Sequence, residues 1–143
     1  MSKEALEKLV KEQIKIERNF VTSVEREIKD VRNVAARLLL LETQKDSEKH
    51  ALILEGILKV IGQKGSKPLW DTLQDSYVDG LVVKRNLKNH IKTEMAMLAH
   101  IEKEMKATED DGIRLLLEHI AEDEKKHHKI LETVIKQSYK IKP

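Results

Sequence analysis

The chain has 143 residues, long enough for one domain whose core needs no disulfide. Its 27 lysines and arginines nearly balance its 25 aspartates and glutamates, and because these charges interleave along the chain, we expect no nucleic acid partner. Cysteine is absent, which excludes thiolate metal sites, Cys nucleophiles and redox disulfides and leaves imidazole and carboxylate as the strong metal ligands.

Targeting and membrane signals are not expected either. Residues 1–8 alternate in charge where a signal peptide would carry an apolar stretch, and no apolar run approaches the length of a membrane span. We therefore expect a cytoplasmic protein without a membrane partner.

Almost the whole sequence follows the 3.6-residue apolar period of a helix, and five glycines and two prolines leave few places for a break. The pattern predicts Asn33 as the N-cap of a second helix, and a long connection over residues 62–79 that holds Trp70 and a short helical turn over 68–73. The expected helices cover residues 3–29, 34–61, 80–107 and 110–138. Two short loops and one long crossover predict an all-α antiparallel four-helix bundle, in which the second and third helices run parallel.

The sequence also repeats itself, because residues 10–61 return as residues 87–138 at an offset of 77 without a gap. Of the 52 aligned pairs, 18 are identical. Two copies are too few for a solenoid, so the repeat predicts a duplicated helical hairpin that closes on itself around a pseudo-twofold axis, as one domain over residues 1–143. Such an axis would bring duplicated side chains face to face.

Helical phase places a few polar side chains on the inward apolar stripes. Glu17 and Glu94 are repeat equivalents on the first and third helices, and His50 and His127 are equivalents on the second and fourth. Isolated buried carboxylates are costly and repel one another, and a cation bound by carboxylate oxygen and imidazole nitrogen would resolve both problems. The Glu-x-x-His spacing of Glu124 and His127 favours this, because residues three apart on a helix can bind one ion together.

A lone Glu followed about thirty residues later by Glu-x-x-His, twice over, resembles the pattern of ferritin-like di-iron carboxylate bundles. The sequence is most similar to the rubrerythrin or erythrin branch, whose halves are also duplicated, and the resemblance covers essentially the whole chain. It implies a bound iron centre of one or two ions, with manganese or zinc as alternatives. It also implies Glu17 and Glu94 as terminal ligands, His50 and His127 as imidazole ligands, and Glu124 as a bridging carboxylate.

One position departs from this pattern. The repeat partner of Glu124 is Ser47, so the second bridging carboxylate is missing, and a neutral hydroxyl is a poor ligand. Asp46 is a doubtful substitute, because its equivalent Asp123 accompanies a complete motif. Loss of the carboxylate predicts an asymmetric dimetal site, or one ion held by the second half alone.

The resemblance implies an oxidoreductase that reacts with peroxide or O₂ at the metal, with no catalytic residue separate from the metal site. The rubredoxin-like Cys domain of full-length rubrerythrins is absent, so any electrons are expected to come from elsewhere, from an unknown donor. His90, one turn before Glu94, is a doubtful additional ligand, and core-edge packing is its simpler interpretation. Apolar residues around Trp70 suggest a homodimer. The alternative is a degenerate, non-enzymatic bundle that binds metal or another protein, in which the Glu and His residues form a salt-bridged polar network.

Overall fold

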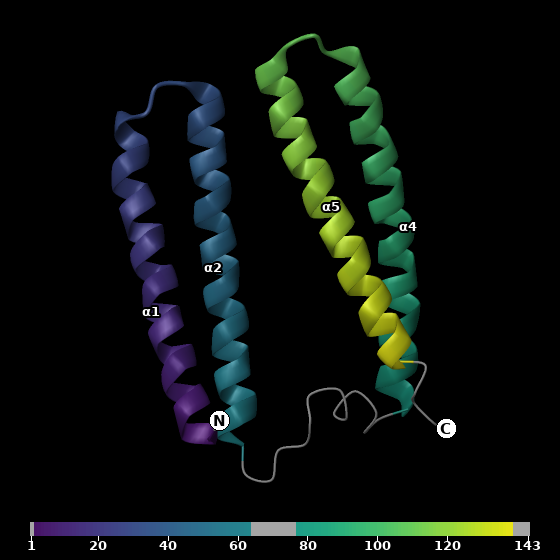
Figure 1. The fold of residues 1–143 in the computed structure, drawn as a ribbon. Coiled ribbons are helices and arrows are strands. Elements are labelled where there is room, and N and C mark those ends of the chain that lie inside the picture. The colour runs from purple at the N-terminus through teal and green to yellow at the C-terminus, as the bar shows by residue number, and fades with distance from the viewer. Residues whose placement is uncertain (1, 64–76, 139–143) are drawn as a thin grey trace. The chain divides into compact units, whose positions relative to one another are not determined.

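Four long helices form the described part of the computed structural model, residues 2–63 and 77–138 (Figure 1). Helix α1 spans Lys3–Glu27, α2 spans Val34–Gly62, α4 spans Tyr77–Ala107 and α5 spans Asp111–Ser138, while a 3₁₀ turn, η1, covers Ile28–Asp30. These ranges contain no β-strand, so the predicted all-α fold is confirmed. The turn predicted over residues 68–73, together with Trp70, lies outside the described residues.

The helices pair into two antiparallel hairpins, α1 with α2 and α4 with α5 (Figure 1). Each hairpin belongs to a compact unit of its own, residues 1–66 and 67–143. The two copies of the sequence repeat therefore adopt the same motif, while the closure of both hairpins into one domain stays a prediction. Among the described residues, no helix combines the length and the hydrophobicity that a membrane span requires.

Helix α4 begins three residues before Gly80, the predicted start. A single glycine in a strongly helical stretch costs only about 1 kcal/mol relative to alanine, which the flanking residues can offset. The other predicted helix ends agree with the structure to within two residues.

The first hairpin turns between η1 and α2, and side-chain hydrogen bonds fix the turn. Asn33 Oδ1 accepts a hydrogen bond from Ala36 N at 2.9 Å, so Asn33 is the N-cap of α2, as predicted. Arg37 reaches back from the first turn of α2, and its Nη1 donates to the carbonyl of Val31 at 3.4 Å.

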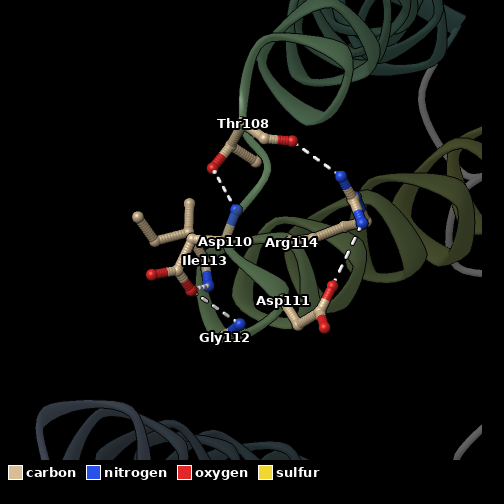
Figure 2. Close-up of polar contacts among 6 residues, drawn as sticks. All are labelled: Thr108, Asp110, Asp111, Gly112, Ile113 and Arg114. Atoms are coloured by element: carbon tan, nitrogen blue, oxygen red, sulfur yellow. Dashed lines mark hydrogen bonds and ion pairs between the residues drawn. The ribbon is translucent and has the colours of Figure 1, made fainter.

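The second hairpin builds the same turn (Figure 2). Asp110 Oδ1 accepts hydrogen bonds from Gly112 N at 2.8 Å and from Ile113 N at 3.0 Å, which satisfies two backbone donors at the start of α5. Arg114 Nη2 donates to the carbonyl of Thr108 at 2.6 Å.

The two turns correspond residue by residue. Asn33 is the repeat equivalent of Asp110, and Arg37 is the equivalent of Arg114. Each arginine binds the carbonyl six residues before it, so the identity of this residue in both copies has a local structural reason.

Each hairpin buries a narrow core where its two helices touch. The buried apolar residues are Val10, Val24 and Ala51 in the first hairpin and Ile101, Ala121 and Ile135 in the second. Leu6, Ile113 and Ile120 also lie at inward helical phase and are exposed. Within a hairpin each helix has one neighbour, which covers only part of such an apolar stripe.

Candidate metal centre

Three of the predicted ligands form a cluster in the second hairpin. Glu124 and His127 lie three residues apart on one face of α5, and Glu94 reaches them from α4. His127 Nδ1 lies 3.7 Å from Glu94 Oε1 and 4.0 Å from Glu124 Oε2. One possible ligand atom from each residue lies within 4.8 Å of the other two.

The two carboxylates of this cluster are enclosed and the imidazole lies at its rim. The side chains of Glu94 and Glu124 are 16% and 14% exposed, against 45% for His127. Glu94 Oε2 and Glu124 Oε2 are buried and have no hydrogen-bond partner among the described residues. Leaving one such oxygen without a partner costs about 1–3 kcal/mol, and more when the group is charged. A bound cation would supply the missing partner.

The spacing of the ligand atoms fits a small cation after a slight contraction. Two ligands held about 2.1 Å from one ion at a tetrahedral angle lie roughly 3.4 Å apart. The observed 3.7 and 4.0 Å exceed this spacing by a few tenths of an ångström. Side-chain rotation can close such gaps, and the mixture of oxygen and nitrogen donors suits Fe, Mn or Zn.

The equivalent cluster of the first hairpin contains one carboxylate instead of two. Glu17 on α1 lies beside His50 on α2, with 3.5 Å between Glu17 Oε1 and His50 Nδ1. Gln13 Nε2 donates a hydrogen bond to the same carboxylate oxygen at 3.1 Å. Ser47, which stands where the second hairpin has Glu124, is buried on the same side of α2.

Polar neighbours stabilise the ionised form of Glu17. The Ser47 hydroxyl is the main reason that the pKa of the Glu17 carboxyl lies below the ordinary value of 4.5. Gln13 and His50 lower this pKa further, while burial opposes them. The first hairpin thus holds one ionised carboxylate among several donors, whereas the second holds two carboxylates that share a single imidazole.

The two doubtful ligands lie outside these clusters. The carboxylate of Asp46 forms an ion pair with Lys49 of its own helix at 3.0 Å. His90 is exposed on α4. The structure thus brings Glu17 to His50, and Glu94 to Glu124 and His127, each set within one hairpin. Their convergence on one shared centre stays a prediction.

Two polar residues have roles that helical phase alone does not reveal. Ser47 was interpreted only as a lost ligand, yet its hydroxyl stabilises the ionised form of Glu17. Gln44 is buried, and its Nε2 donates to the carbonyl of Val21 on α1 at 3.1 Å. Its repeat equivalent is Ala121. The replacement of an apolar residue by a glutamine at this position could have indicated a polar contact that only the first hairpin has.

A comparison with protein families matches residues 15–135 to the Rubrerythrin family model. Comparisons with curated proteins and with solved structures found no significant match. The family match covers both hairpins and every candidate ligand described above. The chain belongs to the rubrerythrin family.

Proposed function

We propose that this protein is a non-haem iron oxidoreductase whose principal metal ion is held by Glu94, Glu124 and His127 of the second hairpin. Family membership supports iron as the metal. The observation that carries the proposal is the pair of buried carboxylate oxygens, Glu94 Oε2 and Glu124 Oε2, that lack a hydrogen-bond partner.

The donor set suits a redox-active ion. When bound, iron supplies a centre that cycles between ferrous and ferric states with peroxide or O₂ as the oxidant. Glu94 and Glu124 would bring two negative charges, which favour the more highly charged ferric form. The low exposure of both carboxylates limits access of water and strengthens their interaction with a cation.

His127 differs from the carboxylates in its exposure. One ring nitrogen of His127 faces both carboxylates, while nearly half of the side chain is exposed. His127 therefore lies on the more accessible side of the cluster. We infer that a small oxidant reaches the centre from this side. These 143 residues contain no cysteine for a rubredoxin-like site, so the helical bundle itself would not supply the electrons.

The first hairpin would add a weaker second half-site. Glu17 and His50 offer one carboxylate and one imidazole, but Ser47 supplies no charge. We therefore propose about one tightly bound ion per chain. A second ion would bind only if Glu17 exchanged part of its hydrogen bonding for metal ligation.

Metal analysis tests the proposal directly. Protein purified without chelator should contain about one iron per chain, and Glu124→Ala should contain almost none. Glu118→Ala changes an exposed glutamate on the same helix and should retain the metal. Peroxide-driven oxidation of bound ferrous iron, followed by absorbance, should be lost in the same variant that loses the metal. Equal metal content in wild type and Glu124→Ala would reject the proposal and favour a bundle without metal chemistry.

A further inference from the structure

The methionines of this chain gather on one helix. Three of its four methionines, Met95, Met97 and Met105, lie on α4, whereas α1, α2 and α5 contain none. Helix α4 also carries Glu94, a candidate ligand of the second hairpin. Because cysteine is absent, the thioethers of methionine are the only sulfur groups of the chain that peroxide can oxidise.

Two of these methionines contribute little to the packing of their hairpin. Met95 is 58% exposed and Met97 is 40% exposed, whereas Met105 is half-buried. At about 100° per residue, Met105 lies roughly 20° around α4 from Glu94, on the inward apolar stripe. Met95 lies about 100° to one side of Glu94, and Met97 lies about 60° to the other side. The two exposed thioethers therefore flank the candidate ligand.

The sequence repeat shows that the hairpin motif does not require methionine at these positions. Arg18 and Phe20 of α1 are the equivalents of Met95 and Met97. Phe20 is 42% exposed, so its position has nearly the same exposure in both hairpins. The thioethers occur only in the hairpin whose cluster contains two carboxylates and one imidazole. Their presence thus follows the candidate metal centre and not the helical motif.

We propose that Met95 and Met97 are oxidation sites that consume peroxide beside the metal centre and so protect its ligands. This inference rests on the proposed function, in which peroxide reacts at an ion held by Glu94, Glu124 and His127. At about 1.5 Å per residue, the backbone of Met95 lies roughly 1.5 Å from that of Glu94 along the helix axis, and the backbone of Met97 roughly 4.5 Å. An oxidant that leaves the centre therefore meets a thioether within one helical turn.

Oxidation of a thioether by peroxide needs no additional reductant. A lone pair of the sulfur attacks one peroxide oxygen, the O–O bond breaks, and the second oxygen leaves as water with both protons. The sulfur loses two electrons and becomes a sulfoxide, and the peroxide is reduced by the same two electrons. Reductases of the methionine sulfoxide class regenerate the thioether, so each methionine can react again. His127, which is 45% exposed at the rim of the cluster, is the ligand that this reaction would protect.

Peptide mass spectrometry after treatment with hydrogen peroxide tests which methionines react. In chelator-treated wild type, Met95 and Met97 should form sulfoxide at least about threefold faster than the less exposed Met105. Bound Fe²⁺ should accelerate the oxidation of Met95 and Met97 about threefold further, but not that of Met105, which lies about 16 Å from Glu94 along the helix. Glu124→Ala should lose only the acceleration by iron.

Phe20→Met is the matched control for this experiment. It places a thioether of similar exposure three residues after Glu17, in the hairpin that lacks the second carboxylate. The introduced methionine should be oxidised about as fast as Met97 in chelator, and iron should not accelerate its oxidation. Equal acceleration at positions 20 and 97 would assign the reaction to iron in solution and overturn the proposal. Equal rates at Met95, Met97 and Met105 in chelator would also overturn it.

The double variant Met95→Leu, Met97→Leu tests the protective role. Leucine has a similar apolar volume, so helicity by circular dichroism and iron content should match wild type. With iron and peroxide, oxidation of His127, measured from the mass of its peptide, should be about threefold faster in the variant. Unchanged oxidation of His127 would overturn the proposal, and so would a loss of iron, which would make the methionines ligands.

Iron analysis of the wild-type samples distinguishes a failure of this inference from a failure of the proposed function. Absence of iron would reject the metal centre, and the protective role of Met95 and Met97 would be rejected with it. Bound iron without faster oxidation of Met95 and Met97 would reject this inference alone.

Discussion

Replacing Glu124 by glutamine should change stability in opposite directions with and without metal. In the metal-free protein, Glu94 and Glu124 place two carboxylates beside one imidazole, with two buried oxygens unpartnered. Glu124→Gln removes one negative charge and adds an amide that can donate to Glu94. The free energy of unfolding of the metal-free protein should therefore rise by about 1–3 kcal/mol. For a chain of this length, that stabilisation corresponds to a rise in melting temperature of roughly 3–9 °C.

With metal bound, wild type should instead be more stable than Glu124→Gln. An ion at one hundred times its dissociation constant stabilises the native state by about 2.7 kcal/mol, or roughly 8 °C. Wild type should gain this increment with Mn²⁺, or with Fe²⁺ under anaerobic conditions, and Glu124→Gln should gain little of it. Thermal unfolding followed by circular dichroism, with chelator and then with saturating metal, measures both effects.

Glu118→Gln is the matched control for this experiment. It makes the same chemical change at an exposed position of α5, so its melting temperature should follow wild type with and without metal. The reasoning is refuted if metal does not stabilise wild type, or if Glu124→Gln and wild type respond equally. A lower melting temperature of Glu124→Gln in chelator would show that the two carboxylates do not oppose each other in the metal-free protein.

Three further predictions follow from the paired hairpins. Ser47→Glu restores the missing carboxylate and should raise metal content from about one ion toward two per chain by elemental analysis; unchanged content would contradict a latent half-site. Ser47→Ala should raise the pKa of Glu17 and destabilise chelated protein by about 1 kcal/mol at pH 7. Because the pKa of Glu17 is lowered in the folded state, this stabilisation is present above about pH 4.5 and disappears as pH falls through the folded value, so the melting temperatures of wild type and variant should converge once the pH lies below that folded value. Asp110→Ala and Asn33→Ala each remove a helix cap and should lower the melting temperature by roughly 3 °C, whereas Glu109→Ala, an exposed neighbour, should not.

Local signals made the helices and turns predictable from the sequence. Asn33 was identified as an N-cap because a side-chain oxygen just before an apolar-periodic run satisfies backbone donors, and the structure confirms it. The predicted start of the third helix at Gly80 was three residues too late, because the helical preference of the residues on both sides outweighs that of one glycine. The arginine contacts to the turn carbonyls were not anticipated, since sequence identity across a repeat does not say which atom a side chain binds.

The candidate site was predictable in part. Phase and the three-residue spacing pointed to Glu94, Glu124 and His127 as neighbours, and the structure places them within reach of one another. Ser47 was considered only as a residue that cannot bind metal, yet it lowers the pKa of Glu17 on the neighbouring helix. This effect depends on the packing of α1 against α2, which a pattern on one helix does not contain.

Duplication turns the two hairpins into controls for each other, and their candidate ligands differ at one repeat position, Ser47 against Glu124. In the first, one carboxylate faces donors from Ser47, Gln13 and His50, so the cluster is satisfied without an ion. In the second, two carboxylates face one imidazole, and two of their oxygens are left unpartnered. To bind a cation, Glu17 would have to release at least one of its donors, at a cost of about 1.5 kcal/mol for a hydrogen bond to a charged group. That alone makes its affinity roughly tenfold weaker, before the missing carboxylate is considered. Serine at position 47 therefore acts twice against metal in the first hairpin, since it supplies no ligand charge and it stabilises the ionised Glu17 without an ion.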